Sequence, residues 1–402
     1  MEETGVSGLF CGGVLVVEVS QSAGQDWQSM RQQMPAASTV AYFDHAAVSP
    51  ISGPAQEAIG QWATQAAEQG GLVWAQWDRR VEQIRERAAE LIGADSGEIA
   101  FVANTTTGIS LVAEGLPWES GDNVVTLANE FPSNLYPWMN LHSRGVETRR
   151  VPVDGVAVDL NRIMEACDER TRLISASWVS YLSGWRLDVA ELVQAAHDRG
   201  ILVFLDAIQG LGVFPLHVAQ TEVDFMAADG HKWMLGPEGA GLLYIRQDRL
   251  DQLRPLGVGW HSVTHAHDFS RIELAWREAA ARYEGGSQNM AGVLGLGASL
   301  DMLASYGLGC NDSPLASRVV EVAELASERL TSLGAKIVSC REGAHRSGIV
   351  SFDLPGRDLA AARRRCAAKA VILSCRGGLL RISPHAYVNE EDIERLIEVL
   401  SE

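Results

Sequence analysis

The sequence predicts an α/β protein with a mainly parallel sheet, followed by a smaller α+β domain at the C-terminus. Its length of 402 residues exceeds what one hydrophobic core usually organises, so we expect two domains of unequal size. From Tyr42 onward, short apolar runs alternate with helix-length amphipathic segments, which is typical of a parallel sheet. After about residue 300 this rhythm changes.

Six short apolar runs are expected to form the strands of the large domain. Helix-length segments separate them, and such segments allow the crossover connections that parallel strands need. The runs are Ile99–Ala103, Asn123–Leu127, Leu173–Trp178, Ile201–Leu205, Phe225–Ala227 and Gly241–Ile245.

A helical segment near Ala291–Ser305 leads into the second domain. There we expect a helix from about residue 316, a further helix after the second strand, a last helix from Glu390, and strands at Lys336–Ser339, Gly348–Phe352 and Val371–Ser374. The predicted organisation is a large domain over residues 37–300 and a small domain over 301–402. Residues 1–36, rich in Gly, Ser and Gln, are expected to form a poorly structured tail.

Composition argues against several classes of partner. A formal net charge of −18 repels nucleic acids and anionic lipid surfaces, so neither is expected as a partner. The six cysteines show no CxxC pair and no regular spacing, which indicates neither a zinc site nor a disulfide framework and favours the cytoplasm. The apolar run near Val14 follows acidic residues, unlike a signal peptide, and no run has transmembrane length.

Two charged residues follow neighbouring predicted strands. Asp206 comes directly after Ile201–Leu205, and Lys232 follows the run that begins at Phe225. Open α/β sheets bind ligands at the edge where such strands end, and a lysine among apolar neighbours loses its proton more easily. Separately, Asp206 could be a helix cap and Lys232 a surface lysine, but their occurrence together in this order favours a shared site.

A threonine-rich segment, Asn104–Gly108, lies between a predicted strand and a predicted helix. Free N–H groups and hydroxyls at a helix N-terminus bind anions, although the segment could also be a simple N-cap. A lysine, a carboxylate, a phosphate site and a cation for a carboxylate are what pyridoxal phosphate (PLP) chemistry requires.

Several motifs together resemble the class V aminotransferase family of fold-type I PLP enzymes, which includes cysteine desulfurases, selenocysteine lyases, kynureninase and isopenicillin N epimerase. The resemblance runs from about residue 40 to the C-terminus. It implies a large domain with a mainly parallel, seven-stranded sheet and a smaller C-terminal α+β domain. The motifs are Tyr42–Pro50, the threonine segment, Asp206-x-x-Gln209, Gly230–Gly239 and Arg381–His385.

The resemblance also implies a role for each matching residue. Lys232 would be the catalytic residue and carry the cofactor as a Schiff base, Asp206 would pair with the pyridine nitrogen, and Gln209 would bond the phenolic oxygen. Family members are commonly homodimers with shared active sites, so Ser287 would reach the partner's phosphate. The remaining cofactor-binding residues would be Thr105, Thr106, Phe131, Tyr181 and His231, and the substrate-binding residues His45, Arg376 and Arg381.

Three positions depart from the desulfurase pattern. Phe131 stands where desulfurases have a stacking histidine, and phenylalanine stacks without exchanging a proton; alternatively, it is a core aromatic. Tyr181 replaces an asparagine, and its phenol can donate a similar hydrogen bond. Asp229 replaces a serine, and because a carboxylate beside a phosphate is repulsive, we expect it to point elsewhere.

The segment before Arg381 departs most. In one desulfurase branch a nucleophilic cysteine lies in a loop between two arginines, but here Arg376 is followed by only four residues before Arg381. Cys375 lies on the other side of Arg376, in an apolar run, where a buried thiol is inert. Arg381 is expected to bind a carboxylate through two parallel bonds, unless it forms only a surface ion pair.

These observations favour a PLP-dependent enzyme that acts on an amino acid by epimerisation, C–S or β-elimination, or transamination, without the desulfurase cysteine. One alternative is a cysteine desulfurase or selenocysteine lyase. Another is a PLP-binding protein without turnover, although a regulator of this kind would need a DNA-binding domain that the tail does not offer.

Overall fold

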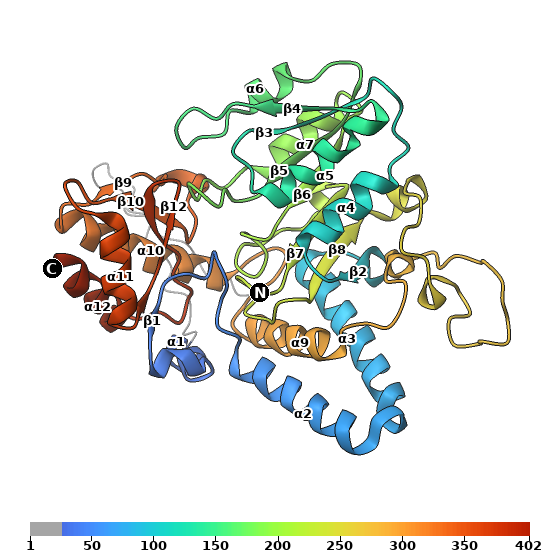
Figure 1. The fold of residues 1–402 in the computed structure, drawn as a ribbon, viewed down its shortest axis with the longest axis horizontal. Helices are drawn as coiled ribbons and strands as arrows, with labels where there is room; N and C mark the ends of the chain where they lie inside the picture. Colours follow the sequence, from blue (N-terminus) through green and yellow to red (C-terminus); the bar gives the residue numbers. More distant parts are fainter. Residues whose placement is uncertain (1–25) are drawn as a thin grey trace, which may run out of the picture.

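The computed structural model describes residues 26–402, and Figure 1 shows a large domain beside a smaller one that contains the C-terminus. The large domain is built on a seven-stranded sheet in the order β2-β8-β7-β6-β5-β3-β4. Five neighbouring strands, from β7 to β4, are parallel, and β8 runs antiparallel to both β2 and β7. The strands are β2 (Ile99–Val102), β3 (Asn123–Leu127), β4 (Glu147–Val151), β5 (Thr171–Ser177), β6 (Leu202–Asp206), β7 (Phe225–Asp229) and β8 (Gly241–Ile245).

All six strand runs expected for the large domain form strands, and the mainly parallel sheet is confirmed. The sequence did not indicate β4, which lies at the edge of the sheet and has only Val151 buried. An edge strand with polar residues on both faces lacks the apolar run by which a buried strand is recognised.

Helices cover both faces of the large sheet and give it two separate cores. Phe204 of β6 packs into one core with residues of α4 and α5, whereas its neighbours Val203 and Leu205 pack into the other with residues of α3, α7 and α9. Side chains alternate across a strand, so a continuous apolar run serves both faces. The helices of this domain are α2 (Gly53–Gln69), α3 (Trp74–Ile92), α4 (Thr105–Gly115), α5 (Tyr136–Asn140), α6 (Leu160–Glu165), α7 (Val189–His197), α8 (Val218–Thr221) and α9 (Met290–Ser305).

The small domain pairs an antiparallel sheet, in the order β12-β13-β10-β9, with three helices. Its strands are β9 (Lys336–Ile337), β10 (Val350–Asp353), β12 (Ser374–Arg376) and β13 (Leu379–Ile382), and its helices are α10 (Pro314–Ser332), α11 (Leu359–Ala368) and α12 (Glu390–Ser401). The sequence did not indicate β13, which forms a hairpin with β12 through Gly377 and Gly378, both at positive φ. The predicted boundary at residue 300 falls inside α9, which runs on unbroken.

The N-terminal segment links the two domains. Residues 1–25 of the expected tail lie outside the described residues, but residues 26–36 contain the helix α1 (Trp27–Gln32). Met30 is buried there, and Arg31 lies 2.5 Å from Asp392 of α12. Strand β1 (Ala41–Tyr42) then pairs in parallel with β11 (Val371–Ile372). The expectation of a poorly structured tail is therefore wrong for residues 26–36, because packing against the small domain orders them.

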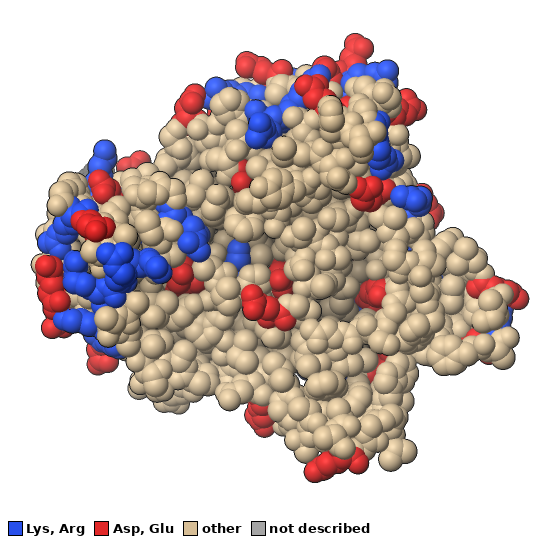
Figure 2. Space-filling model, in the orientation of Figure 1, with Lys and Arg blue, Asp and Glu red and all other residues tan. Residues whose placement is uncertain are grey.

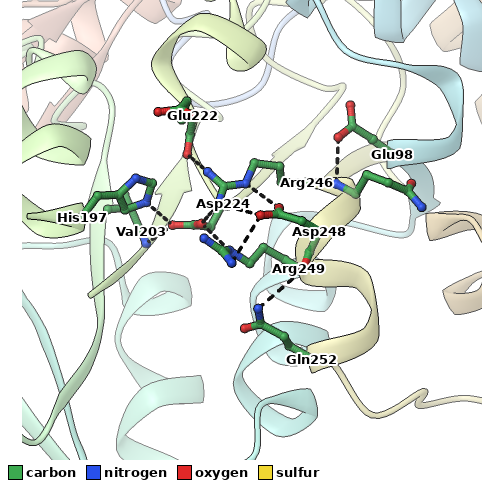
Figure 3. Close-up of polar contacts among 10 residues, drawn as sticks. Glu98, His197, Val203, Glu222, Asp224, Arg246, Asp248, Arg249 and Gln252 are labelled. Atoms are coloured by element: carbon green, nitrogen blue, oxygen red, sulfur yellow. Dashed lines mark hydrogen bonds and ion pairs between the residues drawn. The ribbon is translucent and has the colours of Figure 1, made fainter. Parts of the chain in front are cut away.

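A buried carboxylate fixes the sheet at the end where β7 begins (Figure 3). The fully buried Asp224 accepts hydrogen bonds from the backbone N–H of Val203 at 2.8 Å and from Arg249 Nε at 2.8 Å. His197 Nε2 lies 2.9 Å and Arg246 Nη2 3.2 Å from the same carboxylate. Asp229 ends the same strand, so the opposite end of β7 is left to form the site.

Within residues 26–402, no helix is both long and apolar enough to cross a membrane.

Candidate active site

A cavity of about 240 Å³ lies where the parallel strands end, between the two domains. Figure 2 shows a hollow in this position, with a lysine or arginine side chain visible at its floor. The large domain contributes the ends of β6 and β7 and the start of α4, and the small domain contributes the β12–β13 hairpin. The lining residues are Ala46, Ala47, Val48, Asn104, Thr105, Thr106, Phe131, Ser133, Tyr181, Asp206, Ile208, Gln209, Asp229, His231, Lys232, Arg376 and Arg381.

Asp206 is the last residue of β6 and presents a buried carboxylate to the cavity. It accepts a hydrogen bond of 3.2 Å from the backbone N–H of Ile208. Burial raises the pKa of Asp206 to about 6, and the nearby Lys232 opposes this shift. A buried carboxylate binds a protonated nitrogen strongly, because the positive charge stabilises the ionised carboxylate in place of the water that burial removes.

Lys232 lies in the turn after β7 and is buried, so it is not a surface lysine. Burial lowers the pKa of its amine to about 8, although the carboxylate of Asp206 favours the charged form. At neutral pH a much larger share of this amine is unprotonated than in an ordinary lysine, which a nucleophilic attack on an aldehyde requires.

Phe131 and Tyr181 form an aromatic side of the cavity. Their rings meet edge to face at a centroid distance of 5.3 Å, and Lys232 Nζ lies 5.7 Å from the centroid of Phe131. Phe131 is 45% exposed, so its alternative assignment as a core aromatic is wrong. The preceding Glu130 is buried and accepts hydrogen bonds from the backbone N–H and hydroxyl of Ser177, which fixes the Phe131 loop to β5.

The start of α4 provides donors for an anion. Asn104 is the N-cap, since its side chain accepts the Thr107 N–H at 2.9 Å, so the N-cap interpretation holds alongside the anion site. The Thr106 hydroxyl donates to Ser133 Oγ at 2.8 Å, and the Thr105 hydroxyl accepts the Asp229 N–H at 3.0 Å. The first N–H groups of the helix have no partner within the helix and are available to a phosphate.

Asp229 does not point away from the site, as the sequence led us to expect. It lines the cavity, accepts the N–H of Gly230 at 2.7 Å, and lies 2.8 Å from His231 Nδ1. The His231 contact is close, although the two atoms are not aligned for a hydrogen bond. The imidazole and the Gly230 N–H thus offset a carboxylate that would otherwise repel a phosphate.

Gln209 lines the cavity with an amide that is held on both sides. Its Nε2 donates to the Ala46 carbonyl at 2.9 Å, and its Oε1 accepts from Trp233 Nε1 at 2.9 Å. One N–H of the amide remains for a ligand oxygen.

Two arginines reach the cavity from the small-domain hairpin. Arg381 is 1% exposed and lies 3.2 Å from Asp44, so its ion pair is buried and not at the surface. Burial lowers the pKa of Arg381. Arg376 is exposed and donates to the Cys375 carbonyl at 3.1 Å. The deep arginine and the arginine at the rim are thus distinct in environment.

Two predicted site residues lie outside this cavity. His45 is fully buried, with Nδ1 2.9 Å from the Ser383 carbonyl and Nε2 2.8 Å from the Tyr387 hydroxyl, and its contact with substrate stays a prediction. Both ring nitrogens are occupied. Ser287 is exposed before α9, and its contact with a partner subunit stays a prediction.

Cys375 is half-buried in β12, opposite Leu380, and does not line the cavity. It is less buried than expected because β12 lies at the edge of its sheet. Among residues 26–402, no cysteine belongs to the cavity wall.

Sequence reasoning missed several wall residues and one ion-pair partner. Asp44 lies inside the motif Tyr42–Pro50 and Ser133 lies two residues after Phe131, but neither was given a role. Asp44 meets Arg381 across 337 positions of sequence, and no local pattern indicates such a contact. The roles of Ser133 and Asp44 follow from their neighbours in space, which the sequence alone does not give.

The cavity residues fit PLP. A buried carboxylate, a lysine of lowered pKa, an aromatic ring and a helix N-terminus match the pyridine nitrogen, aldehyde, ring face and phosphate. In addition, the N–H groups of Arg381 that make no hydrogen bond within the protein suit a substrate carboxylate.

Sequence comparison identifies the family. The model of the family described as "Aminotransferase class-V" matches residues 41–396. A probable cysteine desulfurase of Methanothermobacter thermautotrophicus is 32% identical over 93% of this chain and 97% of its own. A probable cysteine desulfurase of Chlamydia trachomatis is 30% identical, over 82% of this chain and 84% of its own.

Solved structures agree in fold. C-DES, a cystine C-S lyase crystallised with its product cysteine persulfide, is 25% identical over 92% of this chain and 99% of its own, with a TM-score of 0.85. The cysteine desulfurase CsdA of Escherichia coli is 25% identical over 94% of this chain and 98% of its own, with a TM-score of 0.83. The fold is therefore that of fold-type I PLP enzymes, and PLP is the cofactor. The chain belongs to the class V aminotransferase family and is a cysteine desulfurase-like, PLP-dependent enzyme.

Proposed function

We propose that this enzyme cleaves the Cβ–S bond of cystine or cysteine. With cystine the sulfur leaves as cysteine persulfide, and with cysteine it passes to a small free thiol. The observation that carries the proposal is the placement of the Lys232 amine and the Arg381 guanidinium at one cavity, which suits an α-amino acid. The relatives support sulfur chemistry in particular, since they are named as desulfurases or as a cystine lyase. They favour the desulfurase-type alternative over epimerisation or transamination.

The residues of the chain divide the work of the reaction. PLP, when bound, supplies an electron sink that stabilises negative charge at Cα. Arg381 would hold the substrate carboxylate and so fix which Cα bond faces that sink. Lys232 would accept the Cα proton, which its lowered pKa favours. Asp206 would keep a proton on the ring nitrogen, and Phe131 and Tyr181 would exclude water from one side.

The fate of the carbon skeleton tests the proposal. Elimination from cystine breaks the Cβ–S bond, releases cysteine persulfide, and leaves a fragment that hydrolyses to pyruvate and ammonia. Desulfuration of cysteine instead yields alanine and passes the sulfur to a thiol. We expect cysteine persulfide and pyruvate when purified enzyme is incubated with cystine, and alanine and a persulfide when it is incubated with cysteine and a small thiol. Racemised amino acid, or keto acid without sulfur release, would contradict C–S cleavage.

A cysteine desulfurase that uses its own thiol is the second candidate, and the names of the relatives favour it. The candidate thiol closest to the site in sequence is Cys375, in the strand that ends at Arg376. We expect Cys375→Ser to keep turnover within about threefold, because its thiol is not part of the cavity wall. Loss of turnover with retained PLP absorbance would instead assign Cys375 as the sulfur acceptor.

A PLP-binding protein without turnover remains the rival from another class. It predicts that amino acids alter the PLP spectrum without forming any product. Recording the PLP absorbance during the same incubations distinguishes this alternative, because the spectrum and the products are then measured together.

A further inference from the structure

The guanidinium of Arg381 is held at three points. Nε donates to Ser374 Oγ at 3.2 Å, Nη1 to the Tyr181 carbonyl at 2.8 Å, and Nη2 to Asp44 Oδ1 at 3.2 Å. A guanidinium has five N–H groups, so one remains on each terminal nitrogen. A carboxylate needs two such groups for a two-point pair.

Asp44 and Ser374 close a hydrogen-bonded triangle with Arg381. The Ser374 hydroxyl donates to Asp44 Oδ1 at 2.8 Å while it accepts from Arg381 Nε, and Asp44 Oδ1 also accepts from Arg381 Nη2. Ser374 and Arg381 face each other in the β12–β13 hairpin. Asp44 comes from the segment after β1 and forms a parallel bridge with Ser383, which directly follows β13.

Asp44 also connects this triangle to the cavity wall. Two to four positions after Asp44, Ala46, Ala47 and Val48 line the cavity, and the Ala46 carbonyl accepts from Gln209. One short segment therefore contacts both the arginine of the small domain and a polar residue of the large domain.

We propose that Asp44 is a positioning residue: it orients the Arg381 guanidinium so that its two uncommitted N–H groups face the substrate carboxylate. This rests on the proposed function, in which Arg381 is the carboxylate anchor. Asp44 acts through geometry, because its oxygen fixes one edge of the planar fork and, through Ser374, the Nε donor. Without Asp44, the Nη2 hydrogen bond of Arg381 is lost, and Ser374, which accepts from Nε, loses the partner that orients its hydroxyl.

Glycine and methylamine form a matched pair of probes, since both present an amine to the holoenzyme and only glycine carries a carboxylate. Each apparent dissociation constant is obtained by titration, with the PLP absorbance as the signal. The quantity compared between variants is the ratio of the glycine constant to the methylamine constant. Methylamine affinity also reports whether each variant is folded and loaded. For Asp44→Ala we expect glycine to weaken by on the order of tenfold, with methylamine unchanged.

Asp44→Asn is the conservative control, because its amide oxygen can accept from the same two donors. It should restore glycine affinity to within about threefold of the wild type. Ser374→Ala, which removes the bridging hydroxyl and leaves Asp44 in place, should give an intermediate loss. If Asp44→Ala binds no PLP, Asp44→Asn and Ser374→Ala still decide the question.

Four outcomes are distinguishable. Collapse of the ratio in Arg381→Ala with a wild-type ratio in Asp44→Ala would overturn the positioning role and leave the anchor standing. Equal losses of glycine affinity in Asp44→Asn and Asp44→Ala would assign the effect to the charge of Asp44 and overturn the geometric account. An unaltered ratio in Ser374→Ala would show that the Ser374 hydroxyl does not help to orient Arg381 and would overturn the role of the triangle. An unaltered ratio in Arg381→Ala would instead refute the anchor and with it this part of the proposed function.

Discussion

Lys232 is the residue whose environment most alters its chemistry. Burial lowers the pKa of its amine to about 8, so the unprotonated form appears about two pH units earlier than in a free lysine. For apo-enzyme mixed with PLP, we expect the rate of adduct formation to rise with pH and to level off above about 8.

The matching control is N-acetyl-lysine with free PLP, whose rate should continue to rise towards the ordinary lysine pKa. Lys232→Ala should form no adduct that borohydride can reduce. A reducible adduct in that variant, or a profile that follows N-acetyl-lysine, would show that another amine carries the cofactor.

Arg381 and Arg376 differ in burial although both line the cavity. A buried charge-assisted pair contributes about 1.5–3 kcal/mol, so Arg381→Ala should weaken amino-acid binding by about one to two powers of ten. Arg381→Lys keeps the charge but not the planar fork and should recover only part of this loss. Spectral titration with amino acids measures both.

Arg376→Ala is the control for position, because it removes an exposed guanidinium from the rim. We expect a smaller effect, since water screens exposed charges. If Arg376→Ala loses affinity and Arg381→Ala does not, the carboxylate binds at the rim.

At the scale of elements, local sequence predicted the apolar strands of the large sheet and missed two strands for different reasons. Every apolar run of the large sheet became a strand, whereas β4 has polar residues and β13 follows β12 so closely that the two resemble one segment. Helix α1 was missed because its order comes from contacts with α12, more than three hundred residues away.

The site was predictable in its parts and not in its connections. Asp206 and Lys232 follow buried strands, so the sheet topology alone brings them together. His45 lies outside the cavity wall although it belongs to the same motif as wall residues, because sequence does not tell which side of an irregular segment faces a cavity. The Asp44 contact depends on the packing of both domains.

The β12–β13 turn offers a prediction for an element. Gly378 has a φ of 79° with open space around its Cα, and Gly356 in another turn has a φ of 79° and equally open space. Alanine at either position costs about 1 kcal/mol of stability, because a left-handed backbone disfavours a Cβ. Both variants should lose similar stability in denaturant unfolding.

Only Gly378→Ala should also raise KM for the amino acid, since its hairpin carries Arg376 and Arg381. Equal KM values in the two variants would show that the hairpin geometry tolerates a strained turn. A raised KM in Gly356→Ala would mean that general destabilisation, and not the hairpin, alters binding.

At the scale of the whole molecule, stability and chemistry occupy opposite ends of β7. Asp224 precedes the strand and Asp229 ends it, and a strand of this length spans roughly 16 Å. Asp224→Ala leaves two arginines and a histidine without their shared carboxylate, which should cost about 3–5 kcal/mol.

Denaturant unfolding should record that loss, while the folded fraction keeps the PLP spectrum and KM of the wild type. The exposed Asp248, which pairs with the same arginines, is the control, and Asp248→Ala should cost less than about 1 kcal/mol. A changed PLP spectrum in folded Asp224→Ala would mean that the two ends of the sheet are coupled.

The two-residue turn at Gly377 and Gly378 also bears on how such an enzyme can acquire new chemistry. The turn follows Arg376, which lines the cavity, whereas the residues that we propose to bind PLP lie on the large domain. Residues inserted there would extend over the cavity mouth without displacing Asp206 or Lys232, and loop insertions carry a small entropic cost. The hairpin is therefore a site where insertions are tolerated. A longer turn can bring a new nucleophile to the substrate while the residues proposed to hold the cofactor stay in place.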